Sequence, residues 1–309
     1  MSRRDPPEDR SPADLLSFGV VNLDKPPGPS AHQVAGWVRD AVADALDEAG
    51  EADHGVDRAA HAGTLDPKVT GCLPTLLGDG ARVAQVFDDS VKEYVAVLEL
   101  HGPAPADLDA VLGEFEGEIY QKPPRKSAVV RRLRTRTVHA IDVLEREERR
   151  VLCRVRCQAG TYIRKLCHDV GRALGTGAHM GDLRRTATGT FDDADLVTME
   201  DLVDALAFWV EDGDDGPLRE VVSPAERALT HLPRVVVAPS AAREVAEGAP
   251  VYAPGVLETA PPEAGGATPD AGALVVCVTP GGAAVCLGTL VGDPDADAGT
   301  VVDLERVLV

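Results

Sequence analysis

The pattern of apolar residues changes near residues 220–232, and this change limits what the chain can fold into. Before it, strand-like and helix-like segments alternate, as in the apolar strand expected at 18–24 and the helix expected at 31–49. After it, short apolar runs are separated by glycine and proline turns, which is typical of a small β-barrel. The sequence therefore predicts an α+β part up to residue 231 and a small β domain over 232–309.

The first 17 residues have no apolar stretch after their arginines, so they do not form a secretory signal. Because they are rich in proline and charge, we expect a disordered tail over 1–17. No run approaches the roughly 18 apolar residues that a membrane span needs, so we expect no membrane partner and a cytoplasmic location. Within the α+β part, the pattern predicts that 160–174 runs from a strand into a helix and that 175–185 is a loop and turn.

Charge is distributed very unevenly along the chain. The net charge is −20, and lysine is rare among the basic residues. An acidic, lysine-poor surface favours solubility in concentrated salt, so we expect a halophilic archaeal cytoplasm. Against this background, residues 121–185 contain 17 basic and 6 acidic residues, whereas the segments before and after them are strongly acidic.

The most basic stretch, residues 121–137, has seven basic residues and no acidic one. Such a stretch can be a solvated face, but the contrast with its acidic flanks favours the binding of a polyanion such as RNA. The cysteines do not show the spacing of a zinc site, and we expect buried, reduced thiols and no metal.

Asp66 stands in a loop, HAGTLDPKVTG, between Gly63 and Gly71. Pro67 restricts the backbone of the residue before it, so the carboxylate is presented from a rigid loop. A single fixed carboxylate suits a nucleophile better than a two-carboxylate acid/base pair. The alternative is an ordinary turn, in which the aspartate binds its own backbone.

Tyr162 and Arg164 are two residues apart at the expected end of a strand, where both would face the same side. An aromatic ring beside a guanidinium can stack on a base and pair with a carboxylate or a phosphate. The alternative is a surface arginine that covers a half-buried tyrosine. Tyr94 lies in the middle of another expected strand, where a tyrosine usually packs with its hydroxyl at the rim.

Taken together, seven ordered segments resemble the TruB/dyskerin family of pseudouridine synthases, and within it the archaeal catalytic subunit of H/ACA ribonucleoproteins. The segments are VVNLDKPPGPSAHQV (20–34), HAGTLDPKVTGCLP (61–74), KEYVAVLELHG (92–102), IYQKPPRKSAVVRRLR (119–134), GTYIRKLCHDVG (160–171), GAHMGDLRRTATGTF (177–191) and LPRVVVAPSA (232–241). The resemblance implies a mixed, largely antiparallel sheet with flanking helices and a central cleft over 18–231, and a PUA-like RNA-binding domain over 232–309.

The resemblance also implies roles for individual residues. Asp66 corresponds to the catalytic aspartate, Tyr94 to the tyrosine that stacks on the target base, and Arg164 to the arginine that pairs with the aspartate. The expected substrate-pocket residues are Tyr162, Leu183, His61 and Lys25. The expected RNA-binding residues are Lys122, Arg125, Lys126, Arg131, Arg132, Arg134, Arg184 and Arg185.

By resemblance, the activity is the isomerisation of uridine to pseudouridine in tRNA, at position 55 of the T-loop, and in rRNA with an H/ACA guide RNA. No cofactor is needed. The expected partners are the guide RNA and three small proteins, namely a zinc-ribbon-like peptide, a small β-barrel protein and a kink-turn binder. A non-catalytic RNA-binding scaffold is the main alternative. A glycoside hydrolase would need a second acid near Asp66.

Overall fold

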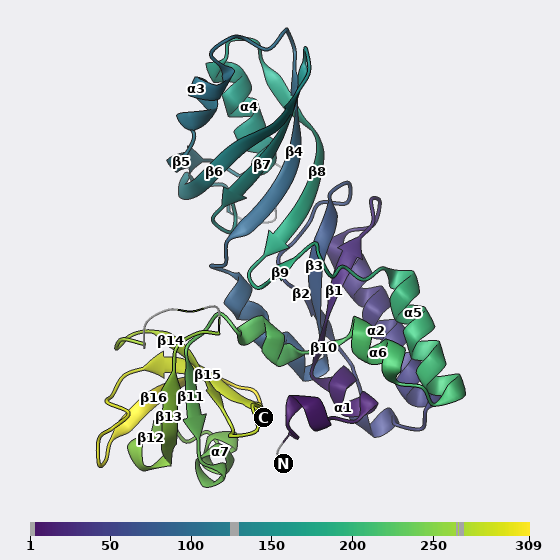
Figure 1. Cartoon of the computed structure of the whole chain (residues 1–309), viewed down its shortest axis with the longest axis vertical. Coiled ribbons are helices and arrows are strands. Elements are labelled where there is room, and N and C mark those ends of the chain that lie inside the picture. The colour runs from purple at the N-terminus through teal and green to yellow at the C-terminus, as the bar shows by residue number, and fades with distance from the viewer. Residues whose placement is uncertain (1–3, 124–129, 264, 266–268) are drawn as a thin grey trace.

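Two β-sheets organise the protein, and their helices lie in separate places around them (Figure 1). The computed structural model describes residues 4–123, 130–263, 265 and 269–309. In this part of the chain, the strands of the first sheet are β1 (Gly19–Lys25), β2 (Ala59–His61), β3 (Thr70–Leu77), β4 (Lys92–Leu100), β5 (Gly117–Gln121), β6 (Arg134–Arg146), β7 (Arg150–Cys157), β8 (Ala178–Thr188), β9 (Phe191–Asp192) and β10 (Ser223–Pro224).

The first sheet has the order β10-β1-β3-β8-β4-β7-β6-β5, with β2 paired to β3 and β9 paired to β8. Within the described residues its pairs are antiparallel except for β3 with β8, which run parallel. The parallel pair is short, and it joins the half of the sheet around β1 and β3 to the half around β4, β6 and β7. The predicted α+β class with a mixed, largely antiparallel sheet is confirmed.

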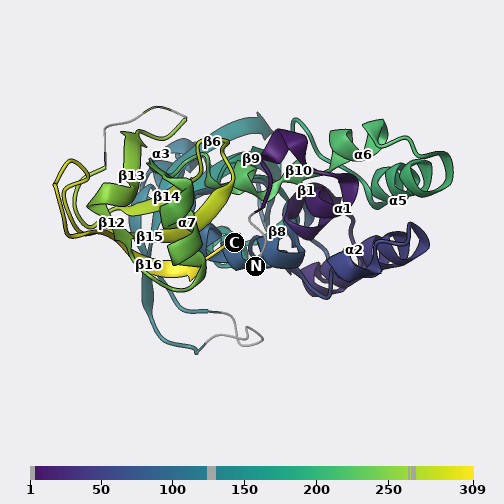
Figure 2. The same cartoon turned by 90° about the horizontal axis from the view of Figure 1, so that it is seen from below.

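Helices cover the two halves of this sheet separately. The longer elements are α2 (Ala31–Glu48), α4 (Ile163–Ala173), α5 (Met199–Ala207) and the 3-10 helix η3 (Gly78–Phe87). The shorter ones are α1 (Pro12–Ser17), α3 (Leu108–Gly113) and α6 (Gly216–Val221), with η1 (Pro7–Asp9), η2 (Ala52–His54), the π-helix η4 (Phe208–Asp212) and η5 (Ala225–Leu229). Seen from below, α2 and α5 lie on one side and the second sheet on the other (Figure 2).

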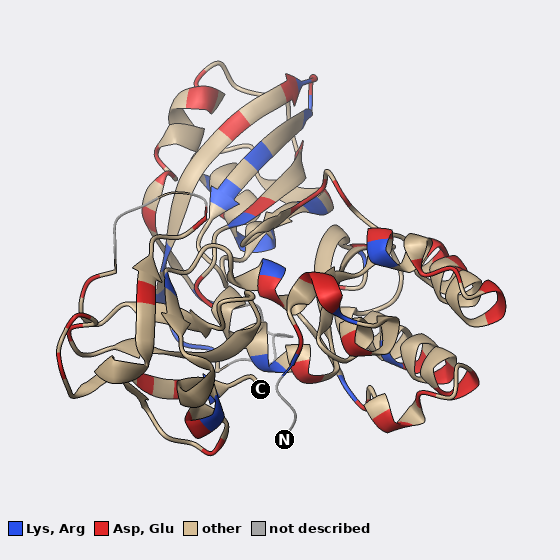
Figure 3. Ribbon diagram, turned by 60° about the horizontal axis from the view of Figure 1, so that its bottom comes forward, with Lys and Arg blue, Asp and Glu red and all other residues tan. Residues whose placement is uncertain are grey.

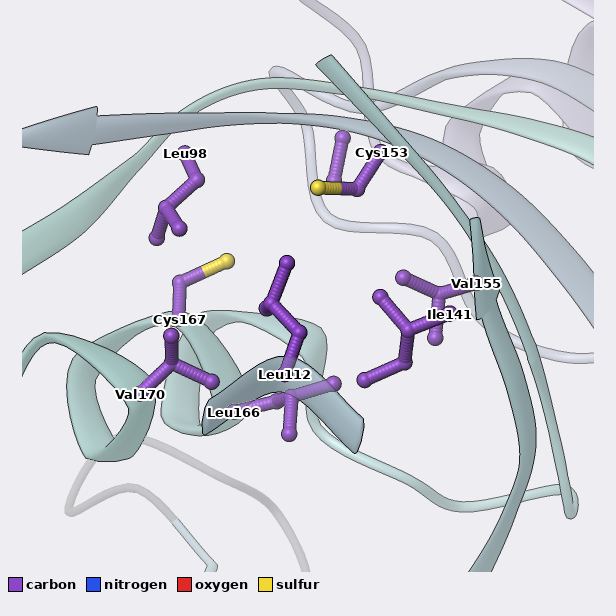
Figure 4. A pocket seen from close by; sticks show the side chains of 9 residues that line it. Leu98, Leu112, Ile141, Cys153, Val155, Leu166, Cys167 and Val170 are labelled. Carbon is purple, nitrogen blue, oxygen red and sulfur yellow. The ribbon is translucent and has the colours of Figure 1, made fainter. Parts of the chain in front are cut away.

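Each half of the first sheet has its own hydrophobic core. In one core, Leu23 and Leu73 pack with Val34 and Val38 of α2. In the other, the β4 and β7 side chains pack with α3 and α4. A small apolar cavity of about 20 Å³ remains inside this second core, lined by residues that include Cys153 and Cys167 (Figure 4). The cavity is formed by core side chains, so it is a packing defect and not a ligand site.

The second sheet has the order β12-β16-β15-β14-β11-β13. Its strands are β11 (Arg234–Val237), β12 (Val251–Tyr252), β13 (Val256–Ala260), β14 (Leu274–Val278), β15 (Ala284–Leu290) and β16 (Thr300–Val307), accompanied by α7 (Pro239–Ala246) and η6 (Ala253–Gly255). One of its faces shares a core with the first sheet, where Val276 and Leu287 pack with Val20 and Leu76. The two sheets are therefore in direct contact.

The prediction of a disordered tail over 1–17 is wrong for residues 4–17. Arg10 is 1% exposed, and its guanidinium donates two hydrogen bonds to the Glu226 carboxylate, at 2.9 and 2.6 Å. The guanidinium of Arg4 lies 3.8 Å from the centre of the Phe18 ring and also donates to the carbonyl of Leu308. The sequence suggested that Arg4 and Arg10 are solvated, but both contact residues that lie much later in the chain.

The prediction of a loop and turn over 175–185 is also wrong from residue 178 onward, because β8 starts there. Glycine, aspartate and alanine in this segment have low β-propensity. The strand forms because it pairs with β4 along most of its length and with β3 near its end.

Charged residues follow the uneven pattern of the sequence (Figure 3). Lys and Arg mark several strands of the first sheet, whereas α2 and α5 carry many acidic positions. Among the helices of the described part of the chain, none combines the length and the apolar character needed to cross a membrane.

Candidate active site

The loop between β2 and β3 presents Asp66 to solvent. Gly63 and Gly71 have φ angles of +87° and +95°, which side chains rarely allow. Between them, the Val69 N–H donates to the Asp66 carbonyl at 3.0 Å, so residues 66–69 form a turn with Pro67 at its second position. The Asp66 side chain is 63% exposed and points away from the packed interior.

Arg164 reaches this carboxylate from the other half of the sheet. Its Nη2 lies 3.3 Å from Asp66 Oδ2. Arg164 lies in the first turn of α4 and Tyr162 is the residue before that helix, so the expectation that they share one face of a strand is wrong. Since both charged groups are exposed, the pair contributes little to stability. Its effect is to orient two groups that come from opposite halves of the sheet.

Tyr94 and Leu183 lie where the two cores meet. Each packs against the core under α2 and also against the core under α4. They sit on the neighbouring strands β4 and β8. Burial raises the pKa of the Tyr94 phenol, and the nearby Arg185 guanidinium acts in the opposite direction. The phenol is therefore neutral at physiological pH.

Tyr162 and His61 occupy the edges of this region. The side-chain amide of Gln121 holds the Tyr162 backbone, because it accepts from the N–H at 2.9 Å and donates to the carbonyl at 3.2 Å. His61 ends β2, directly before the Asp66 loop. Burial and the nearby charge of Arg185 lower the pKa of His61, so its imidazole is neutral at pH 7.

Lys25 supports the loop from beneath. The side chain is fully buried, and Nζ donates to the carbonyls of Pro26, Pro67 and Val69 at 2.9, 3.0 and 2.9 Å. Burial lowers its pKa, although the charge of Asp66 acts in the opposite direction. Lys25 therefore binds the backbone on the far side of the turn that presents Asp66, and it lines this turn rather than an open pocket.

The prediction that Arg185 binds RNA is wrong, because its side chain is 1% exposed and directed into the protein. Its guanidinium is occupied by backbone carbonyls. The adjacent Arg184 is half-exposed and forms a two-point ion pair with Asp24, at 3.0 and 2.9 Å. This pair raises the pKa of Arg184.

The remaining basic residues lie on the connection between β5 and β6. Lys122, Arg131 and Arg132 are exposed, and Arg134 at the start of β6 is half-buried. Arg131 Nε donates to the Pro123 carbonyl at 3.0 Å, across the base of the connection. Arg125 and Lys126 lie outside the described residues.

Sequence reasoning missed two residues that hold this region together, namely Lys92 and Gln121. Lys92 is 4% exposed, and its Nζ donates to the Phe87 carbonyl at 3.1 Å and to two hydroxyls. Burial, together with the charge of Arg185, lowers the pKa of Lys92 to about 7. A lysine at the start of a strand gives no sequence signal for burial, since most such lysines are exposed.

In the part of the chain that the structure describes, no three His, Cys, Asp or Glu side chains are grouped so that they could hold a metal ion. The residues assembled here are instead one exposed carboxylate, one guanidinium and one neutral phenol, with a supporting set of buried cations.

Comparison with known proteins identifies the class. The family profile described as "TruB family pseudouridylate synthase (N terminal domain)" matches residues 52–105 and 102–163, and "tRNA pseudouridylate synthase B C-terminal domain" matches 164–230. A third profile, "DKCLD (NUC011) domain", matches 5–35. These matches cover the Asp66 loop, Tyr94 and Arg164.

Two relatives are similar over the whole chain. A protein of Haloarcula marismortui named "Probable tRNA pseudouridine synthase B" is 69% identical over 100% of this chain and 94% of its own length. One with the same name from Halobacterium salinarum is 63% identical over 100% of both chains.

Solved structures agree with the sequence comparison. A chain from the "Crystal Structure of a Cbf5-Nop10-Gar1 Complex" is 44% identical with a TM-score of 0.86, over 99% of this chain and 89% of that one. A chain from the "Structure of H/ACA RNP bound to a substrate RNA containing 2'-deoxyuridine" is 41% identical with a TM-score of 0.85, over 100% and 91%. The fold and the site thus define an RNA-modifying isomerase. The chain belongs to the TruB family of pseudouridine synthases, in its Cbf5-type branch.

Proposed function

We propose that Asp66 is the reacting carboxylate of this pseudouridine synthase. The supporting observation is the ion pair between Asp66 and Arg164, which brings together groups from the two halves of the sheet at 3.3 Å. In the isomerisation the bond from the ribose C1′ to N1 of uracil breaks and a bond from C1′ to C5 forms. The C5 proton leaves and N1 takes up a proton, so no group enters or is lost overall. The carboxylate can attack the base or the sugar, or assist a proton shift at the ribose.

The other residues receive roles from their positions. The target uridine has to leave its stack to reach the Asp66 carboxylate, and an aromatic ring then receives it. Tyr94 is suited to this because it lies where the two cores meet and its phenol is neutral. Arg164 keeps the carboxylate ionised as the RNA displaces water. Leu183 and Tyr162 border the same region as pocket residues, with His61 behind the loop.

We infer that the substrates are the T-loop uridine 55 of tRNA and, with an H/ACA guide RNA, uridines in rRNA. The names of the relatives support a tRNA substrate, and the Cbf5 structures support assembly with small partner proteins and RNA. The partners would be a zinc-ribbon-like protein, a small β-barrel protein and a kink-turn binder. Residues 18–231 would be the catalytic unit and 232–309 a PUA-like RNA-binding unit. The proposed setting is a salt-rich cytoplasm, in line with the net charge of −20.

The test of this function is the variant Asp66→Asn, which removes the charge and keeps the shape. We expect it to lower pseudouridine formation by about 10³-fold or more, because a nucleophile that acts with its partners is rarely replaceable. Mass spectrometry of a T-loop RNA, with and without guide RNA and partner proteins in concentrated KCl, measures the product. Asp57→Asn is the control, since Asp57 is an 84% exposed loop carboxylate outside the site.

RNA binding by the Asp66→Asn variant is measured in the same samples, and we expect the Kd to stay within a few-fold of the unmodified protein. An Asp66→Asn variant that still makes pseudouridine at an undiminished rate would overturn the assignment. If even the unmodified chain binds RNA without forming product under every condition, it acts only as an RNA-binding scaffold.

A further inference from the structure

A buried guanidinium connects the two ends of the Asp66 loop. Arg185 Nε donates to the Cys72 carbonyl at 2.7 Å, and Nη2 donates to the carbonyls of Ala62 and Gly63, both at 3.2 Å. Ala62 and Gly63 begin the loop and Cys72 follows its end. One side chain therefore fixes the distance between the two points at which the loop leaves the sheet.

The strand that carries Arg185 is tied to the same loop through its backbone. Gly71 is paired with Arg185 in the short parallel ladder between β3 and β8. A Cβ atom on Gly71 would lie 2.2 Å from the Arg185 carbonyl oxygen, and one on Gly63 would lie 3.2 Å from Arg185 Nη1. Glycine at both positions allows this close approach. The Asp66 loop therefore packs directly against Arg185.

The same guanidinium also lies near the ring of Tyr94, which is proposed to receive the target base. Tyr94 is paired with Arg185 between β4 and β8, and the Arg185 guanidinium is near enough to the phenol to act on its pKa. Asp66 and Tyr94 come from different parts of the chain. Within the described residues, Arg185 donates hydrogen bonds to both ends of the loop that carries the carboxylate and also acts electrostatically on the Tyr94 phenol.

No carboxylate in the described part of the chain lies within ion-pair distance of Arg185. Burying a cation without a counter-ion is costly even when carbonyls satisfy its N–H groups. An apolar residue of similar volume would avoid this cost but could not hold the three carbonyls. The arrangement therefore favours a role in the geometry of the site over a role in packing alone.

We propose that Arg185 is a positioning residue, whose guanidinium fixes the Asp66 loop against the Tyr94 ring. The proposal rests on the catalytic role proposed for Asp66. Arg185 does not contact the RNA, because it is 1% exposed. Its effect appears in the rate of the chemical step and not in RNA affinity.

The test is Arg185→Lys, which keeps the charge but cannot reach the three carbonyls together. We expect the single-turnover rate to fall by about 10²-fold, since a shift of about 1 Å in a reacting group costs this much. The Kd for T-loop RNA should change by less than threefold. Arg10→Lys is the matched control because Arg10 is equally buried, at 1%, but bonded to Glu226 outside the site. It should lower the Tm and leave the single-turnover rate unchanged at a temperature where both variants are folded.

A double-mutant cycle with Tyr94→Phe adds a measurement that a purely structural role would not alter. If Arg185 acts partly through the phenol, its replacement should cost less in the Tyr94→Phe background than in the unmodified protein. If Arg185→Lys does not fold, Arg185→Gln serves instead, because it removes the uncompensated buried charge and its single amide cannot hold all three carbonyls.

The proposal is overturned if Arg185→Lys keeps the full single-turnover rate, or if its rate falls only in step with the Tm as in Arg10→Lys. Failure of this proposal can be distinguished from failure of the proposed function. If Asp66→Asn is inactive while Arg185→Lys is fully active, Asp66 keeps its role and only the positioning role fails.

Discussion

Three buried cations surround the site, and each is used mainly to bind oxygen atoms of the chain itself. Lys25 and Arg185 bind carbonyls of the Asp66 loop, and Lys92 binds the segment before β4 and Thr188 of β8. A buried donor that binds fixed carbonyls restrains the backbone more firmly than a surface ion pair does. The exposed Asp66 therefore stands on a loop whose backbone is held from within.

At the residue scale, Lys92 makes the stability of the protein depend on pH. Its pKa is about 7 in the folded protein, against 10.5 for an ordinary lysine, so the unfolded chain binds more protons between these values and stability rises with pH. Below pH 7 the charge is present in both states and this gain is absent. We expect the free energy of unfolding to rise by up to about 2 kcal/mol from pH 7 to 8.5, and the rise to disappear in Lys92→Met.

Urea unfolding in concentrated KCl at several pH values measures this difference. Titration of His61 also contributes near pH 7, because its pKa is lowered in the folded protein, but it contributes equally in Lys92→Met, so the difference between the two proteins reports Lys92. An identical pH dependence in the unmodified protein and in Lys92→Met would show that Lys92 is not the group responsible.

The motifs of the sequence were enough to select Asp66, Tyr94 and Arg164, because their residue types suit the chemistry and the family pattern. They could not show that Arg185 is buried. An arginine is normally exposed, and only the tertiary pairing of β8 with β3 and β4 turns this one inward. For the same reason the sequence placed Arg164 on a strand, although it lies on α4.

At the scale of elements, local signals predicted some parts of the fold well. α2 begins after Ser30, whose side chain accepts from the Gln33 N–H in a capping box, and its apolar positions face the core. β8 could not be predicted in this way, because its residues form a strand only between two partners. The strand that carries Leu183 and Arg185 is therefore the one that local sequence patterns predict least well.

We propose that Lys122, Arg131 and Arg132, which lie exposed between β5 and β6, hold the RNA backbone. We expect the triple variant Lys122→Ala, Arg131→Ala and Arg132→Ala to weaken RNA binding. The slope of log Kd against log salt should also decrease by about two, since each phosphate contact contributes about 0.7 to 0.9 to the slope. Binding titrations of T-loop RNA between 1 and 3 M KCl measure both effects.

A control variant removes three arginines elsewhere, namely the half-exposed Arg39 and the exposed Arg149 and Arg172. This variant loses the same total charge. It therefore distinguishes direct contacts with phosphates from the effect of the protein's overall charge on RNA binding. Equal losses of affinity and slope in the two triple variants would contradict a specific role for the β5–β6 connection.

At the scale of the whole molecule, the N-terminal segment joins the two sheets. Arg10 binds Glu226 of η5, and the same carboxylate accepts from the Ala284 N–H of β15 at 3.0 Å. Composition and charge predicted the opposite, because long-range pairing is not visible in a proline-rich, charged sequence. The division into an α+β part and a small β part, by contrast, follows from the spacing of apolar runs and is present in the two sheets.

Breaking this link should cost stability rather than activity. We expect Arg10→Met to lower the free energy of unfolding by about 3 to 5 kcal/mol, because it leaves the Glu226 charge buried without its partner. Adding Glu226→Gln should recover part of the loss, since the amide oxygen can still accept from Ala284. Urea unfolding of the single and double variants measures the coupling, and strictly additive losses would contradict it.

The contacts of Arg4 and Arg10 also affect the order in which the protein can be assembled. Their partners, Leu308 and Glu226, are synthesised hundreds of residues after them. During translation Arg10 is made 216 residues before Glu226, so their ion pair can form only after the strands of the first sheet have been synthesised. Docking of Arg10 therefore belongs to a late stage of assembly, when its partner helix η5 has followed the strands of the first sheet.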